Sequence, residues 1–218
     1  MNYSVLFIMF LGFVGLFGCQ KQTETITVTG KIWNPNTNQA VSQADVFLSN
    51  KPVSSSVYNA SYQQLAFTAS TSDGSYTLKF DREKSSDYRM RVQKDGYFLY
   101  EKEYAPGTFE SSEDVSLSFD LLSKGYVNTR IRNLSSYNQD DHVVFRFLNI
   151  DQQCSDCCPG GFVHGYGQYF DTSFVCAAPG DDYLVYQYSV TINNATNIFG
   201  PDSVFVNTAD TTDLSIDY

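Results

Sequence analysis

Hydrophobic and polar residues alternate along this chain in short runs, the period of a strand that buries one face. Turn-forming clusters such as Ser72-Asp73-Gly74 separate the runs, and glycine there supplies a positive φ at no steric cost. After residue 25, no stretch keeps apolar residues at helical spacing over three turns. The pattern therefore predicts an all-β protein with little helix. The alternating runs are Ile26–Ile32, Ala44–Leu48, Tyr76–Phe80, Tyr88–Val92, Val115–Leu121, Val127–Ile131, Val143–Phe147 and Leu184–Ile192.

The runs fall into two groups. Residues 26–104 form the first group and residues 113–218 the second. Residues 101–112 between them contain Pro106-Gly107-Thr108 and several polar residues, a composition typical of a linker. We therefore expect two antiparallel β-sandwich domains in tandem, the second one immunoglobulin-like or jelly-roll-like.

Four motif pieces in the first group occur in a characteristic order. They are Gly30-Lys31-Ile32, Gln39–Val46, Thr71–Tyr76 and Gly96-Tyr97. Together they resemble the carboxypeptidase regulatory-like domain, and the resemblance covers roughly a third of the chain. It implies a transthyretin-like β-sandwich with an accessory role and no catalytic residue.

The start of the chain differs from the rest. Residues 1–18 carry no charged side chain, and Val5–Leu11 is continuously apolar, as in a signal peptide. The segment Leu16-Phe17-Gly18-Cys19 resembles the lipobox of bacterial lipoproteins, which implies cleavage before Cys19 and lipid on its thiol. An ordinary signal peptide or an uncleaved span are the alternatives.

Residues 19–25 form a short polar tether after this site. Gln20 follows Cys19, where Asp would indicate retention at an inner membrane. By resemblance to lipoproteins of bacteria with two membranes, we expect a lipid anchor in the outer membrane. The protein would face the periplasm or the cell surface.

Net charge narrows the classes of partner. The chain has a formal charge of −10 and a pI of about 4.5. Nucleic-acid binding needs clustered Lys and Arg to replace phosphate counterions, so we expect no nucleic-acid partner. Electrostatic docking on anionic lipid is disfavoured for the same reason.

Cysteines after Cys19 concentrate in one stretch. They are Cys154, Cys157, Cys158 and Cys176. An even number in an exported domain favours two disulfides, which would stabilise a glycine-rich stretch with few strand formers. Because a bridge between the adjacent Cys157 and Cys158 is strained, we expect Cys154 to pair with one of them and Cys176 with the other.

Two other chemistries suit the same stretch. The four cysteines and His164 have ligand types and a spacing that zinc accepts. Alternatively, a free thiol beside His142 or His164 would be a nucleophile. The oxidising compartment and the even count favour disulfides, so we expect neither a bound metal nor another cofactor.

Carboxylates are frequent in turn-like segments. A glycosidase would need two of them across a cleft, and calcium would need several in one loop. Turn formation by hydrogen bonds from side chain to backbone is the structural alternative. The carboxylates concerned are Asp140, Asp141, Asp181, Asp182, Asp210 and Asp213.

Aromatic residues suggest a contact surface. Tyr166, Tyr169 and Phe170 lie within the cysteine-rich stretch Cys154–Cys176, in a loop-like context where function often resides. Tyr183, Tyr186 and Tyr188 could extend this surface, although core packing explains aromatics on strands more often.

These features together predict a non-enzymatic, membrane-anchored envelope lipoprotein. It would be a binding module for a glycan, a peptide or another envelope protein. The alternative is an accessory subunit or weak hydrolase that acts on envelope polymers.

Overall fold

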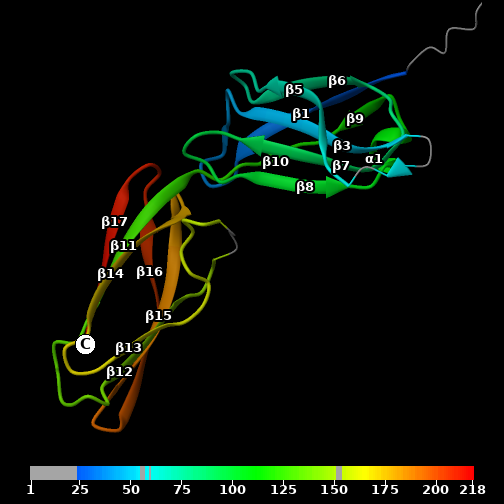
Figure 1. Cartoon of the computed structure of the whole chain (residues 1–218). Helices are drawn as coiled ribbons and strands as arrows, with labels where there is room; N and C mark the ends of the chain where they lie inside the picture. Colours follow the sequence, from blue (N-terminus) through cyan, green and yellow to red (C-terminus); the bar gives the residue numbers. More distant parts are fainter. Residues whose placement is uncertain (1–23, 55–56, 59, 151–153) are drawn as a thin grey trace, which may run out of the picture.

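A computed structural model describes residues 24–54, 57–58, 60–150 and 154–218. Its strands form two modules joined end to end (Figure 1). The predicted all-β class is confirmed. Among the described residues the one helix is α1 (Gly107–Glu110), which has four residues. None of the described residues belongs to a helix that could span a membrane. Cys19 and the predicted signal peptide lie outside the described residues.

The first module contains two sheets that pack face to face. One sheet is built around β1 (Thr25–Asn34), which pairs antiparallel with β2 and β6 and parallel with β9 and β10. The other has β3 and β7 at its centre. The remaining bounds are β2 (Gln39–Ala40), β3 (Asp45–Ser54), β4 (Val57–Tyr58), β5 (Gln63–Ala69), β6 (Ser75–Asp81), β7 (Ser85–Gln93), β8 (Tyr100–Tyr104), β9 (Asp114–Ser116) and β10 (Phe119–Asp120).

The core of this module follows directly from the sequence alternation. Ile26 and Val28 of β1 are buried together with Leu78 of β6, while the residues between them face outward. Val46 and Met90 supply buried side chains from the opposite sheet. Each strand thus buries one face, as its period of two requires.

The linker predicted at residues 101–112 is wrong. Residues 100–104 form β8, which pairs with β7, and residues 107–110 form α1. Phe109 is fully buried, with its ring centroid 4.8 Å from that of Tyr88 and 5.8 Å from that of Tyr104. Pro106 and Gly107 resemble loop punctuation in the sequence, but here they begin a helical turn that inserts Phe109 into the core.

The domain boundary therefore lies later than the predicted one. β9 and β10 belong to the first module, and Leu121 is still part of its core. Their pairing joins residues 87 positions apart in the sequence, such as Ile32 and Phe119, which local patterns do not reveal. The first module extends to Leu121, and the core of the second module begins with Val127.

The second module also has two sheets around one core. One sheet has the order β14-β11-β17, and the other has the order β13-β12-β15-β16. The buried residues of the two sheets form a single cluster with Cys158 and Cys176. The bounds are β11 (Lys124–Arg132), β12 (His142–Phe147), β13 (Val163–Tyr166), β14 (Asp171–Pro179), β15 (Asp182–Ile192), β16 (Ala195–Val206) and β17 (Thr211–Asp217).

Both modules depart from purely antiparallel pairing. β17 pairs parallel with β11, and β9 and β10 pair parallel with β1. In each case the chain arrives from a strand of the other sheet, β16 or β8, rather than through a hairpin. Crossing between sheets allows the two strands to run in the same direction.

The two modules meet at residues 121–124 without a linker. The backbone amide of Phe98 donates to the carbonyl of Leu122 at 2.8 Å, and that of Lys124 donates to the carbonyl of Gly96 at 2.7 Å. The side-chain amide of Asn36 in the first module donates to the carbonyl of Gly180 in the second at 3.0 Å. The modules are therefore held in direct contact.

Candidate functional site

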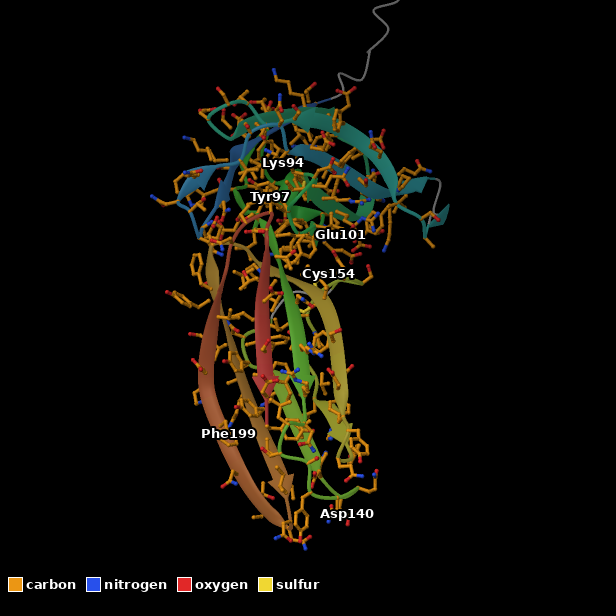
Figure 2. All side chains as sticks on the ribbon, turned by 90° about the vertical axis from the view of Figure 1, so that its left-hand side faces the viewer. Lys94, Tyr97, Glu101, Asp140, Cys154 and Phe199 are labelled. Carbon is orange, nitrogen blue, oxygen red and sulfur yellow. A yellow bond between two sulfur atoms is a disulfide. The ribbon has the colours of Figure 1, made fainter. Side chains whose placement is uncertain are left out.

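The end of the second module away from the first carries a group of exposed rings. β12 and β13 are antiparallel neighbours there, with His142 opposite Tyr166 and Val144 opposite His164. Val143 is buried in the core, so His142 and Val144 point to the outer face of the sheet. Figure 2 shows this end of the module, where the label of Asp140 marks the turn before β12.

The rings at this end are stacked across the two strands. The centroids of His142 and Tyr166 lie 4.2 Å apart with the planes 5° from parallel, and those of His164 and Tyr166 lie 6.3 Å apart at 8°. Tyr166 keeps 64% of its surface exposed. We call His142, Phe162, His164 and Tyr166 the aromatic strip.

The two histidines of the strip touch each other. Nε2 of His142 lies 3.2 Å from Nδ1 of His164, within hydrogen-bond distance. Partial burial, together with the positive charge that His164 would add, lowers the pKa of His142 below its ordinary value. The neutral form of the His142 ring is therefore favoured.

The other end of the aromatic strip combines a ring with a cation. Phe162 is exposed, and the guanidinium of Arg146 lies 5.2 Å from its ring centroid. Arg146 also donates to Oε1 of Gln187 on β15 at 3.4 Å. The guanidinium of Arg146 and the side-chain amide of Gln187 thus place several hydrogen-bond donors beside the apolar ring of Phe162.

Hydroxyl groups of β15 continue this outer face. Thr191 lies opposite His142, and Ser189 lies opposite Val144, so their side chains share the face of the strip. The hydroxyl of Thr191 also lies 2.8 Å from that of Thr196 on β16. The sheet thus presents rings on one pair of strands and hydroxyls on the other.

The three loop aromatics predicted from the sequence have different roles. Tyr166 and Tyr169 are exposed, Tyr169 by 81% of its surface. Phe170 instead packs against the core, and its ring occupies the space where a side chain at Gly165 would begin. Residue 165 must therefore be glycine, and Phe170 is a structural residue.

A buried carboxylate supports the loops beside the strip. Asp141 is fully buried and accepts hydrogen bonds from the amide of Tyr137 at 2.7 Å and from Nδ2 of Asn133 at 2.9 Å. These bonds, that of Tyr137 above all, lower the pKa of Asp141. The carbonyl of Asp141 also accepts the amide of Gly167, which fixes the turn after Tyr166.

The other tyrosines considered from the sequence lie in separate cross-strand pairs. Tyr183 contacts Phe205 near the junction with the first module, and Tyr188 stacks on Phe199. Tyr186 is buried in the core, and its hydroxyl donates to Asp202 at 3.2 Å. The structure does not bring these tyrosines to Tyr166.

The two predicted disulfides are present in the structure. Cys154 pairs with Cys157, and Cys158 pairs with Cys176, which is one of the two pairings expected. All four sulfurs are in disulfides, so none is a thiolate that could bind zinc and none is a free thiol that could act as a nucleophile. Among the described residues, no three His, Cys, Asp or Glu side chains group as metal ligands.

The two disulfides lie at the junction end of the module. The backbone of Cys157 forms an isolated β-bridge with that of Ala177 near the end of β14, and Lys124 donates to Asp156 at 2.9 Å. The same ammonium group lies 5.2 Å from the ring centroid of Phe98 in the first module. The disulfides therefore lie near the junction and away from the aromatic strip.

The candidate carboxylates have local partners. Asp181 accepts a hydrogen bond from the hydroxyl of Thr208 at 2.7 Å, and Asp213 accepts one from the side-chain amide of Asn128 at 2.8 Å. Asp182 and Asp210 each accept the backbone amide of the next residue at 2.7 Å. These contacts agree with the structural roles in turns and strands rather than with an acid–base pair.

No protein-family model and no curated protein matches the chain. Its fold was compared with solved structures, among them the TIE protein of Bacillus anthracis, at 12% identity and a TM-score of 0.37. That alignment covers 88% of this chain but 34% of the other, so this chain spans about a third of its length.

Two pilins were also found. The shaft pilin SpaA of Lactobacillus rhamnosus GG is 9% identical, with 89% of this chain and 97% of the pilin covered at a TM-score of 0.33. The minor pilin GBS52 of Streptococcus agalactiae is 10% identical, with 88% and 94% covered at a TM-score of 0.34. Likeness at this level carries no argument about function.

Sequence reasoning missed the contact between the two histidines. It considered each one only as a partner for cysteine. The local signal was the phase of each strand, since His142 precedes the buried Val143, and His164 and Tyr166 flank Gly165. The pairing of β12 with β13, which aligns them, is not encoded locally.

Proposed function

We propose that this chain is a non-enzymatic binding module of the cell envelope, and that its aromatic strip holds a glycan. The observation that carries the proposal is the group of His142, His164 and Tyr166, whose rings lie within 11° of parallel. His164 and Tyr166 are exposed, and His142 is partly buried. The apolar C–H face of a sugar would pack against such rings. Its hydroxyls would bond to Arg146 and Thr191 on the same face.

The composition of this face favours a sugar over a protein partner. Stable protein interfaces bury about 800 Å² on each side and have an apolar centre depleted of charge. Here exposed rings alternate with imidazole, guanidinium, amide and hydroxyl groups. A ligand that offers both apolar C–H faces and many hydroxyls matches that mixture, and the formal charge of −10 disfavours a polyanionic chain.

The glycan proposal can be tested with the chain from Lys21 onward, which contains every described residue. Calorimetric titration with polysaccharides purified from the source envelope should show saturable binding. Tyr166→Ala should weaken it about tenfold or more, which corresponds to about 1.4 kcal/mol. Tyr183→Ala is the matched control, because Tyr183 is also an exposed tyrosine but lies at the junction end. Equal losses in the two variants, or no binding by the wild type, would refute the proposal.

We also propose that lipid on Cys19 anchors the protein in the outer membrane, with residues 19–25 as its tether. The apolar segment before Cys19 and the lipobox-like sequence support this assignment. Cys19→Ala should move the protein to the soluble fraction or block its processing. Unchanged membrane fractionation and detergent partitioning of this variant would overturn the anchor.

A further inference from the structure

The chain has two histidines, and the fold brings them together. They are 22 residues apart in the sequence, on neighbouring strands, with Nε2 of His142 at 3.2 Å from Nδ1 of His164. We propose that these two nitrogens form a bidentate site for a divalent late transition metal ion, with Cu²⁺ bound most tightly. The two imidazoles also belong to the aromatic strip, but metal binding can be tested without any sugar.

The separation of the nitrogens suits a single ion. Zinc–imidazole bonds are about 2.0–2.1 Å long, so two nitrogens on a tetrahedral ion lie about 3.4 Å apart, and on a right-angled ion about 2.9 Å apart. The observed 3.2 Å falls between these values. The two rings must also turn so that both lone pairs converge on one ion, because the nitrogens face each other almost head-on.

The hydrogen shared by the two imidazoles must be relocated when an ion binds. Metal binding requires the neutral form of each imidazole. One of the two facing nitrogens bears the shared hydrogen. On binding, this proton moves through solvent to the other nitrogen of the same ring, and both facing lone pairs then bond the ion. No net proton is released at a pH where both rings are neutral.

Neighbouring groups restrict one imidazole of the site and leave the other accessible to solvent. Tyr166 stacks on His142 at 4.2 Å, which restricts rotation of that imidazole before the ion arrives. His164 is exposed, so the ion can enter from solvent. Since no third His, Cys, Asp or Glu joins the pair in the described part of the chain, water would complete the coordination.

The choice of metal follows from ligand chemistry. Imidazole suits copper, nickel and zinc, and the affinity of such sites generally rises to Cu²⁺ and falls at Zn²⁺. The net charge of −10 raises the local concentration of cations around the protein. Hard ions such as Ca²⁺ and Mg²⁺ prefer oxygen ligands, so they should not compete.

The test is titration of the chain from Lys21 onward with Cu²⁺, and separately with Ni²⁺ and Zn²⁺, without a polyhistidine tag. We expect one ion per chain, and an electron paramagnetic resonance spectrum of the copper complex with coupling to imidazole nitrogen. His164→Asn and His142→Asn should each weaken binding at least tenfold, since each leaves one ligand. Tyr166→Phe retains both imidazoles and the stacked ring, so it should bind nearly as tightly as the wild type.

Several outcomes would overturn the site. Copper binding that survives both histidine substitutions would place the ion elsewhere on the acidic surface. Absence of saturable binding of Cu²⁺, Ni²⁺ and Zn²⁺ by the wild type would refute the site. Circular dichroism of the exposed His164→Asn variant checks that loss of binding does not reflect loss of folding. The titration contains no sugar, so its outcome does not depend on whether the same rings bind a glycan.

Discussion

Nδ2 of Asn34 in the first module donates to Oγ of Ser123 at 3.2 Å, and that hydroxyl lies 2.7 Å from Oγ1 of Thr208 in the second module. Ser123 is almost completely buried at the junction. The two modules thus share one polar network, in which Asn34 and Ser123 are buried. Such a network should restrict bending between the modules.

Ser123→Ala tests the role of this network. The variant leaves the amide of Asn34 without its acceptor at a buried position, which should lower the free energy of unfolding by about 1–3 kcal/mol. Small-angle scattering should also show a wider range of angles between the modules. Ser215→Ala, on the exposed face of β17, is the control and should change neither quantity. An unchanged scattering profile for Ser123→Ala would contradict a restricting role.

Phe109→Ala should destabilise the first module strongly. Removing a fully buried Phe costs about 3–5 kcal/mol, because neighbours such as Tyr88 cannot fill the space. Denaturant unfolding followed by the fluorescence of Trp33, the single tryptophan, reports on this module. Glu113→Ala, an exposed change in the same segment, is the control. A loss below about 1 kcal/mol would mean that α1 is not part of the core.

The two disulfides should contribute unequally. Cys158 and Cys176 are 18 residues apart and buried in the core, whereas Cys154 and Cys157 are 3 apart. Loop entropy predicts about 3 kcal/mol for the longer loop and about 2 kcal/mol for the shorter. Replacing each pair by serine and measuring thermal unfolding would check the order, which burial of the longer bridge should reinforce. Equal stabilities for the two double variants would refute it.

Alkaline pH should unfold the protein through its buried tyrosines. Burial, with the nearby charge of Asp141, raises the pKa of Tyr218 to about 12, and burial also raises the pKa values of Tyr76 and Tyr88. The unfolded chain ionises at about pH 10, so it binds fewer protons above that pH. The stability from these neutral tyrosines is therefore complete below about pH 10 and is lost as pH rises through the folded pKa values.

Urea midpoints measured from neutral pH to about pH 11 should fall steeply beyond about pH 10. Tyr76→Phe should make the fall less steep, because it removes one group that resists ionisation. At neutral pH the same variant should be less stable by about 1 kcal/mol, since the hydroxyl of Tyr76 donates to the carbonyl of Leu117 at 2.6 Å. Tyr183→Phe, at an exposed tyrosine, should leave the pH dependence unchanged.

Local patterns predicted the strands well and their partners poorly. Tyr76–Phe80 alternates visibly because one face of β6 is buried, and the structure has a strand there. β9 was expected as the start of a second domain, yet it pairs with Thr27–Thr29 of β1. Periodicity reports that a face is buried, but it does not report against which distant strand.

The same limit applied to the candidate site. Tyr166 and Tyr169 are exposed, but Tyr166, which was expected in a loop, lies on strand β13. The disulfides followed from cysteine count and compartment. Phe170 was expected in the same loop, but its ring packs against Gly165, a contact that the sequence alone does not reveal. The approach of His142 to His164 depends on strand register, a property of the folded sheet.

The parallel pairing of β1 with β9 and β10 gives the first module a particular response to mechanical load. A force between Thr25 and Leu121 pulls β1 toward its start and the β9–β10 segment toward its end, so the neighbouring strands are sheared. Backbone bonds such as those from Thr27 to Glu113 and from Leu121 to Trp33 would then bear the tension together rather than one after another. Stretched between its two ends, this module should yield only at high force, whereas a hairpin would unzip.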